Sequence, residues 1–409
     1  MKRWMKWLLV FALAAVVFFA VRLWHEAHPF ALGAPLAEGK VRPQLLSGGD
    51  SAVLLAPDGT LWTWGEGTRF PNGRSEIPLR LGTESDWIEI AGSLGFLLAR
   101  KSDGSLWSGE SSPIATDRRA DHVAFAATRI GADTDWTFIA TTGYGGTFAI
   151  QKSGAVWASG PFDNDSRDRT PTQFGIESDP VAITADIVSR YVLRREGTIW
   201  SRVPRHGSGG RISMELAQIG TDGDWTAISA YGELLALKKD GTLWKGGAGG
   251  ASFEAVPEGT KPVAGVLKRV GSDNDWIEMR DGHHCYLARK RDGSWWASGE
   301  NLDGRLGFAP YGTHWGIELE KMPFTFDPWA LGLGGKTTLV FARDGSLWSW
   351  GRDLGAMPPN SENKAFENSV NGWGDRFLWR LKLFPDPDAQ WSHRPRKIWQ
   401  WTAGGRGAR

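Results

Sequence analysis

Short apolar runs separated by tight polar turns recur along most of this chain. Runs such as residues 96–99 and 234–237 hold only four consecutive apolar residues and are flanked by Gly and acidic residues, so they indicate buried strands rather than helices. Most runs lead into an Asp-Gly pair, which is a strong hairpin signal because Gly adopts positive φ without steric cost and Asp tolerates it. The pattern predicts antiparallel strands joined by tight turns.

One cluster of five residues recurs seven times: an acidic residue or Ser, Gly, a small residue, an apolar residue and Trp. The copies occupy residues 58–62, 103–107, 153–157, 196–200, 240–244, 292–296 and 344–348, and their tryptophans are 45, 50, 43, 44, 52 and 52 residues apart. Such a period means one small unit that buries its apolar face only against its neighbours. About 45 residues of antiparallel strand per unit is typical of a propeller blade, so the chain is predicted to be an all-β, seven-bladed β-propeller.

A second landmark, Gly followed by an Asp-Trp pair, precedes several copies at residues 81–87, 130–136, 219–225 and 270–276, with weaker versions at 174–180 and 326–329. Its Asp-x-Asp pairs are Asp133/Asp135, Asp222/Asp224 and Asp273/Asp275. They recur in phase where a turn must start, and Asp side chains hydrogen-bond their own backbone in such turns. The out-of-phase triplet at 163–165 lacks the Gly and terminal Glu of a calcium loop. We interpret these residues as structural and assign no metal ligand and no cofactor.

The repeats resemble those of the regulator-of-chromosome-condensation repeat family. Residues 58–65 (DGTLWTWG) and 344–351 (DGSLWSWG) match that repeat closely, and residues 296–307 match its Asn-x-x-Gly-Gln-Leu-Gly loop with Arg305 in place of Gln. The resemblance covers about residues 45–405 and implies a seven-bladed propeller of a divergent bacterial type. Most copies lack the family's loop and its His, so the departure falls in the loops, where function is expected to lie.

The C-terminal residues restart the repeat pattern and suggest how the ring closes. Residues 393–405 parallel residues 78–92, and the first repeat lacks its own Asp-Trp landmark. We predict that the strand around Trp399 joins the blade that contains Trp62, which would remove exposed sheet edges. Deleting residues 394–409 should then sharply lower the melting temperature, and an unchanged melt would rule this closure out.

Composition narrows the classes of partner. The chain has 409 residues with 47 basic and 46 acidic side chains, for a net charge of +1. This balance argues against a general polyanion binder and against the nucleosome-docking role of nuclear relatives, so no nucleic-acid partner is expected. The single cysteine excludes an internal disulfide framework, and it does not indicate in which cellular compartment the protein lies.

The N-terminus predicts a membrane anchor. Lys2, Arg3 and Lys6 precede an apolar run at 7–21, which ends at Arg22. A run of about 15 residues is short, but it spans a bilayer if flanking tryptophans sit in the interfaces and Arg22 snorkels. The predicted organisation is a cytoplasmic stub at 1–6, a transmembrane signal-anchor helix at 7–24, a linker at 25–40 and the propeller at 41–405, placed on the periplasmic or extracellular side of the cytoplasmic membrane. A cleaved signal peptide is the alternative.

Most of the 24 tryptophans fall in phase with the repeat and serve packing. Those clearly outside the pattern are Trp315, Trp373, Trp379 and Trp391, of which three lie in a longer insertion at about 352–395. Together with Arg380 they have the composition of an interface hot spot, so they are candidate partner-binding residues. The alternative is an extra strand at 380–383 packed on the last blade.

Catalytic chemistry has one weak candidate, the cluster His283-His284-Cys285. Successive side chains on a strand face opposite ways, so adjacency does not pair a thiol with an imidazole, and we assign no catalytic residue. The first functional hypothesis is a membrane-anchored, protein-binding scaffold. The alternatives are a cell-envelope glycan-active enzyme and an enzyme inhibitor built on the propeller face. Affinity capture from solubilised membranes alongside a glycan-binding screen separates these classes.

Overall fold

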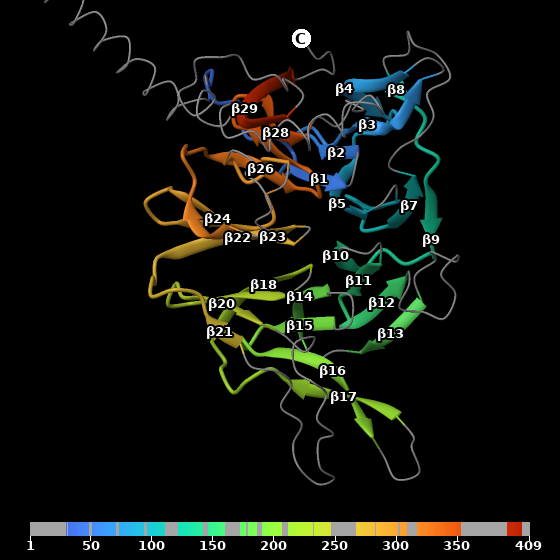
Figure 1. Cartoon of the computed structure of the whole chain (residues 1–409). Helices are drawn as coiled ribbons and strands as arrows, with labels where there is room; N and C mark the ends of the chain where they lie inside the picture. The colour runs from blue at the N-terminus through green and yellow to red at the C-terminus, as the bar shows by residue number, and fades with distance from the viewer. Residues whose placement is uncertain are drawn as a thin grey trace, which may run out of the picture.

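The computed structural model describes Phe30 and residues 32–48, 51–70, 73–93, 96–110, 122–141, 146–159, 172–176, 179–185, 190–206, 212–231, 233–246, 267–282, 284–301, 303–308, 317–352 and 391–402. These residues form seven antiparallel sheets arranged as a ring (Figure 1). The predicted all-β, seven-bladed propeller is therefore confirmed. The predicted span at 7–24 lies outside the described residues, and within them no helix has the length and apolar character needed to cross a bilayer.

Each blade is one sheet, numbered here in chain order. Blade 1 holds β1 (Gln44–Gly48), β2 (Ser51–Leu55), β3 (Leu61–Phe70) and β4 (Gly73–Leu81), with β8 (His122–Val123) added in parallel at its outer edge. Blade 2 holds β5 (Trp87–Ser93), β6 (Phe96–Lys101), β7 (Leu106–Glu110) and β9 (Thr128–Ile130). Blade 3 holds β10 (Trp136–Thr141), β11 (Thr147–Gln151), β12 (Ala155–Ser159) and β13 (Thr172–Ile176).

The remaining four blades follow the same order. Blade 4 holds β14 (Pro180–Ala185), β15 (Arg190–Arg194), β16 (Ile199–His206) and β17 (Ile212–Gln218). Blade 5 holds β18 (Trp225–Ala230), β19 (Leu234–Lys238), β20 (Leu243–Gly246) and β21 (Leu267–Arg269). Blade 6 holds β22 (Trp276–Gly282), β23 (Cys285–Lys290), β24 (Trp295–Gly299) and β25 (Ile317–Lys321), and blade 7 holds β26 (Pro328–Leu333), β27 (Thr337–Ala342), β28 (Ser346–Arg352) and β29 (Trp391–Gln400).

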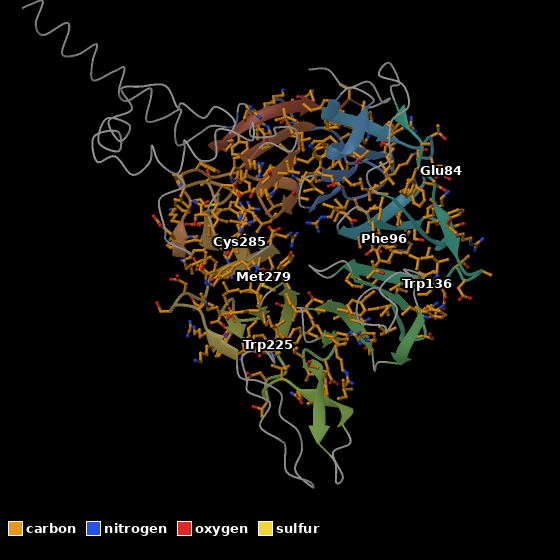
Figure 2. The ribbon with its side chains drawn as sticks, turned by 45° about the vertical axis from the view of Figure 1, so that its right-hand side comes forward. Glu84, Phe96, Trp136, Trp225, Met279 and Cys285 are labelled. Atoms are coloured by element: carbon orange, nitrogen blue, oxygen red, sulfur yellow. The ribbon has the colours of Figure 1, made fainter. Side chains whose placement is uncertain are left out.

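Side chains fill the spaces between neighbouring blades, as the labelled Phe96, Trp136, Trp225 and Met279 illustrate around the ring (Figure 2). Phe96 and Trp136, from blades 2 and 3, belong to one buried cluster, and Met279 belongs to a cluster that joins blades 5 and 6. Each of the seven buried clusters formed by the described residues joins two neighbouring blades, because the apolar face of one blade is covered by the face of the next. This is why the repeat must be iterated for the fold to be stable.

The two faces of the ring are built from different connections. Strand direction alternates within an antiparallel blade, so the second-to-third turns share one face with the connections that lead to the next blade. These connections hold three to six residues each and include the seven repeat turns at Gly59, Gly104, Gly154, Gly197, Gly241, Gly293 and Gly345; we call this side the turn face. The first-to-second and third-to-outer connections leave from the opposite side, which we call the loop face.

The turns require their glycine. In the Asp103-Gly104 turn, Gly104 has φ +82°, and a Cβ there would lie 2.0 Å from the carbonyl oxygen of Thr134 in the next connection. Glycine therefore supplies both the left-handed backbone and the close approach between neighbouring turns. The seven turn glycines have φ values of 81° to 85°, so the predicted hairpins are confirmed in all seven blades.

The predicted ring closure is wrong in its strand assignment. β29 pairs with β28, so Trp399 belongs to the blade of Trp348, and the blade of Trp62 takes all four of its main strands from residues 44–81. The reason is that the first blade already has an inner strand, β1, and an outer strand, β4. Ring closure comes from packing instead: the rings of Trp62 and Trp399 lie 4.9 Å apart across the seam, inside a buried cluster shared by blades 1 and 7.

A segment before the first strand also crosses this seam. Phe30 and residues 32–41, called here the strap, run from blade 7 to blade 1. The backbone N–H of Gly33 donates to the Asp344 carboxylate (2.7 Å), and that of Leu36 donates to the Arg343 carbonyl (2.8 Å). Much of the stretch suggested as a linker is therefore in contact with the propeller.

Candidate functional site

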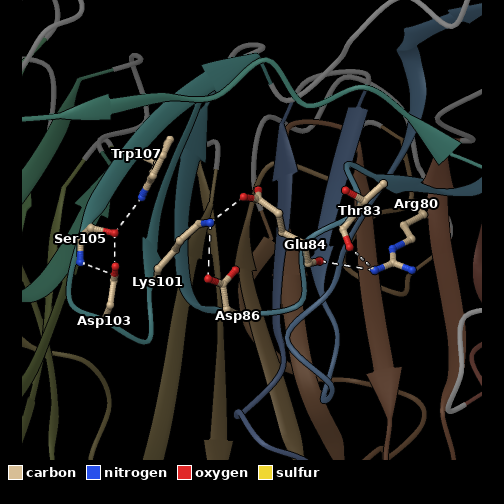
Figure 3. Close-up of polar contacts among 8 residues, drawn as sticks. All are labelled: Arg80, Thr83, Glu84, Asp86, Lys101, Asp103, Ser105 and Trp107. Atoms are coloured by element: carbon tan, nitrogen blue, oxygen red, sulfur yellow. Dashed lines mark hydrogen bonds and ion pairs between the residues drawn. The ribbon is translucent and has the colours of Figure 1, made fainter.

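A lysine held between two tryptophans is the recurring polar feature of the turn face. In blade 2, the Lys101 Nζ lies 4.8 Å from the Trp87 ring and 4.9 Å from the Trp107 ring. The same nitrogen lies 2.6 Å from a Glu84 oxygen and 3.4 Å from an Asp86 oxygen (Figure 3). Such an ammonium is stabilised by the aromatic faces and by the carboxylates together. We call this arrangement the lysine clamp.

The clamp is repeated in blades 5 and 6. Lys238 is held by Trp225, Trp244, Asp222 and Asp224, and Lys290 by Trp276, Trp296, Asp273 and Asp275. Burial by itself would lower the Lys290 pKa, but hydrogen bonds and charge attraction from Asp273 and Asp275 outweigh it and raise that pKa above its ordinary value. The Asp-x-Asp pairs of these two blades thus have a structural role, as predicted. Their partner is a lysine rather than only their own backbone.

The small residue of the repeat links the turn to the tryptophan. In blade 2, the Trp107 indole N–H donates to the Ser105 hydroxyl (2.8 Å), which donates to the Asp103 carboxylate (2.6 Å; Figure 3). Matching Trp-to-hydroxyl bonds occur in blades 1, 4, 5, 6 and 7. The sequence motif is therefore a hydrogen-bond relay that satisfies a partly buried indole.

Blade 3 shows how the relay and the clamp compensate for each other. This blade has Ala155 where the others have Ser or Thr, and Gln151 where the clamps have Lys. The Trp157 indole N–H donates to the Gln151 side-chain carbonyl (2.9 Å), and the Gln151 amide donates to Asp133 (3.1 Å) and Asp135 (3.2 Å). One neutral side chain thus replaces both the missing hydroxyl and the missing cation.

Removing one clamp cation is expected to destabilise the ring. Lys238→Met removes two cation–π contacts and leaves Asp222 and Asp224 facing each other, for an expected loss of about 2 kcal/mol in the free energy of unfolding. Urea unfolding measures this loss. The matched control is Lys239→Met, because Lys239 is exposed and adjacent. If Lys239→Met lowers the free energy of unfolding as much as Lys238→Met does, the contacts of the clamp do not add to stability.

Acidification is expected to weaken the turns. Hydrogen bonds from the Ser105 side chain and backbone hold the pKa of Asp103 below its ordinary value of 3.8, and Asp240 and Asp292 have lowered pKa values through the equivalent hydroxyl residues. Because the lowered pKa belongs to the folded state, this stabilisation is present above pH 3.8 and is lost as the pH falls through the folded-state values. Urea unfolding across this acid range should show the decline, and Asp240→Asn should make it shallower.

The loop face has connections of very unequal length. The third-to-outer connections range from two residues between β3 and β4 to 38 residues, 353–390, between β28 and β29. Residues 247–266 join β20 to β21, and residues 300–316 join β24 to β25. A rigid scaffold that carries loops of variable length on one side is the usual arrangement for a recognition surface.

Solved structures with the same fold include yeast RCC1 (Prp20) bound to Kap60, with a TM-score of 0.52 and 14% identity over 80% of this chain and 83% of that chain. Prp20p from Saccharomyces cerevisiae gives a TM-score of 0.50 and 14% identity over 80% and 85% of the two chains. Human WBSCR16 gives 0.50 and 14% over 72% and 89%. This chain has the RCC1-like propeller fold.

The resemblance inferred from the repeats is thereby confirmed for the fold. No protein-family model and no curated protein sequence matches the chain. At 14% identity, the likeness extends to the arrangement of the blades and not to the residues of a functional site.

The order of the strands assigns four of the five predicted binding residues to two connections that begin at the loop-face ends of neighbouring blades. Trp315 falls in the connection between β24 and β25 of blade 6, and Trp373, Trp379 and Arg380 fall in that between β28 and β29 of blade 7. These four residues lie outside the described ranges. Trp391 is the first residue of β29, where its backbone pairs with Arg352. The long insertion therefore leaves and re-enters the blade at one point, while the contacts of the predicted side chains remain a prediction.

The described part of the β24–β25 connection packs against the scaffold. The Asn301 side chain accepts from the Leu306 N–H (2.8 Å) and donates to the Phe308 carbonyl (3.0 Å), which fixes the loop. Arg305, which replaces the family's Gln, is 2% exposed and donates to the Glu300 carbonyl (3.1 Å). Its own carbonyl accepts from the Thr338 hydroxyl of blade 7 (2.7 Å). Arg305 therefore joins blades 6 and 7 and is not presented to a ligand.

Cys285 is not an activated nucleophile. It begins β23, is 3% exposed, and burial raises the pKa of its thiol to about 12 (Figure 2). A thiol with so high a pKa carries almost no thiolate near neutral pH. The structural interpretation of the His283-His284-Cys285 cluster is supported for its cysteine.

One buried ionisable group, the carboxyl of Asp281, is not predicted by the sequence. Asp281, near the end of β22, accepts a hydrogen bond from the Gly282 N–H (2.9 Å), and burial raises its pKa well above the ordinary value. A carboxyl of this kind stays protonated above the usual pH range for Asp. The pattern of apolar and polar residues along β22 does not show that the Asp281 side chain is buried, so its burial is known only from the fold. Among the described residues, no group of three potential ligands is arranged to hold a metal.

Proposed function

We propose that this chain is a membrane-anchored RCC1-like propeller that binds another protein through its loop face, outside the cytoplasmic membrane. The observation that carries the proposal is the contrast between the faces. On the turn face, the lysines of the clamps and the hydroxyls of the relays already have partners within the ring. The long connections, by contrast, all leave from the loop face.

The proposed contact residues are Trp315, Trp373, Trp379, Arg380 and Trp391. Trp and Arg are enriched among residues that dominate binding energy, because they combine large contact area with directed hydrogen bonding. Their two connections start from neighbouring blades, so one partner surface of ordinary size covers both attachment points.

The likeness in fold supports protein binding as the class of activity. Yeast RCC1 was solved bound to Kap60, and Prp20p is described by its binding to Gsp1p and histones. These partners belong to those proteins. The proposal takes from them only that a propeller of this shape serves as a protein-binding scaffold.

The proposed location rests on the N-terminal sequence. Positive residues at 2, 3 and 6 precede the apolar run, which favours a cytoplasmic N-terminus and a propeller on the outer side. Treatment of intact cells with an external protease, or of spheroplasts where an outer membrane is present, tests this topology. Resistance of the propeller in spheroplasts, with cleavage only after lysis, would contradict it.

Affinity capture with the full chain tests the function. Trp379→Ala combined with Arg380→Ala is expected to weaken capture of a specific membrane-derived partner by about 30-fold or more, because each truncation removes a hot-spot side chain. The melting temperature should not change. The matched control is Lys239→Ala with Arg291→Ala, which removes two exposed basic side chains from the turn face.

Two outcomes would contradict the proposal. A large loss of stability in the Trp379/Arg380 variant would favour the alternative of an extra strand at 380–383. Turnover of a cell-envelope glycan by the purified chain would favour the enzymatic alternative.

A further inference from the structure

The first residue of the strap, Phe30, lies in an aromatic pocket near the turn face of blade 7. The Phe30 ring lies 4.9 Å from that of Trp348 and 5.7 Å from that of Phe326, measured between centroids. The rings of Phe324 and Trp350 complete the pocket at 6.1 Å and 6.3 Å. Four aromatic neighbours at these distances hold a phenylalanine in one position.

The polar contacts of the strap all lie on the same face. Gly33 and Leu36 bond to Asp344 and Arg343 in the second-to-third turn of blade 7, and Val41 donates to the Pro57 carbonyl in the equivalent turn of blade 1 (3.2 Å). The strap is therefore fixed along the turn face from Phe30 onwards.

The distance from this fixed point to the predicted anchor is short. The predicted span ends at residue 24, so five residues, 25–29, separate it from Phe30. The six Cα-to-Cα steps from residue 24 to Phe30 reach at most about 20 Å even when fully extended. The turn-face end of blade 7 must therefore lie within that distance of the bilayer surface.

The opposite orientation does not fit this tether. From Trp348 to Arg352 at the loop-face end of β28 there are four residues, which span about 13 Å. A loop face turned towards the bilayer would leave only about 7 Å between it and the lipid surface. The loop face also carries the longest connection of the chain, the 38 residues between β28 and β29, whereas the turn-face connections hold only three to six residues.

We infer that the strap holds the propeller with its turn face towards the bilayer and its loop face towards the partner. The inference rests on the proposed membrane anchor and adds the surface that each side of the ring contacts. Lipid headgroups lie beneath the turns of blades 7 and 1, and a protein partner approaches the loop face without competing with the membrane.

Energy transfer from the full chain to labelled lipid tests the orientation. One fluorophore is placed at Thr325→Cys, exposed on the turn face of blade 7, and in a second variant at Lys336→Cys on the loop face of the same blade. Cys285→Ala removes the buried native thiol from both variants. In phosphatidylcholine vesicles with acceptor-labelled headgroups, transfer should be greater from position 325, because the height of the blade, about 20 Å, separates the two labels.

The controls separate the possible failures. If the full chain does not float with the vesicles, the membrane anchor is wrong and the inference falls with it. If the chain floats but transfer is equal or greater from position 336, the anchor stands and the orientation is wrong. A long Gly/Ser insertion after Glu26 should abolish the difference between the labels, since it lengthens the tether. A difference that survives this insertion would overturn the role of the strap.

Discussion

Trp399→Ala is expected to lower the free energy of unfolding by about 3–5 kcal/mol, the loss typical of a large buried aromatic side chain. Trp399 is 3% exposed and packs on Trp62 across the seam between the last and first blades. Among the described strands, none pairs across that seam, so side-chain packing and the strap hold the ring closed there. Urea unfolding followed by tryptophan fluorescence, with circular dichroism as a second probe, measures the change.

Lys397→Ala is the matched control for this variant, because its side chain lies exposed on the same strand. Its effect should stay within about 0.5 kcal/mol. Equal effects of the two variants would mean that the seam does not depend on the indole. Deleting residues 394–409 should lower the melting temperature further, although for a reason other than that first predicted: it removes most of the outer strand of blade 7 and not a strand of blade 1.

Phe30→Ala is expected to cost about 2–4 kcal/mol, because Phe30 is half-buried among four aromatic rings and truncation leaves a cavity between them. Thermal and urea unfolding of the full chain in detergent would report the loss.

Leu32→Ala controls for changes in the strap that do not touch the pocket, since Leu32 is 46% exposed. A stability unchanged by Phe30→Ala would show that the strap rests on the ring without supporting it. In that case Phe30 would no longer be a fixed point on the ring, and the strap would not set the orientation of the propeller.

The blades could be predicted because their signals are local. An Asp-Gly turn, a hydroxyl two residues after the Asp and a Trp two residues later are contiguous, and together they form the relay seen in blade 2. The lysine clamp was missed because its members are spread along the blade: Glu84 and Lys101 are 17 residues apart in sequence. Its signal was nevertheless present, as a Lys two residues before the turn Asp in blades 2, 5 and 6.

For the candidate binding residues, only the connection in which each one lies could be determined. The sequence identified them by their departure from the repeat, and the order of the strands assigns them to two connections that begin on neighbouring blades, or to the start of β29 that ends one of them. Their mutual contacts depend on connections without the repeat pattern, where residue type alone does not specify a conformation. Asp281 is the reverse case, because its raised pKa comes from burial, which an alternating strand pattern does not reveal.

The number of blades, the positions of their turns and the class of fold follow from the amino-acid sequence alone, since each unit repeats the same short-range chemistry. How the ring closes, what the turn acids bind and where the strap lies follow only from the folded structure. These features join residues far apart in the chain, such as Gly33 and Asp344 at a separation of 311 residues. In the sequence, the last outer strand has the same pattern whichever sheet it joins, so only its pairing with β28, beside a first blade whose outer strand is already β4, settles its place.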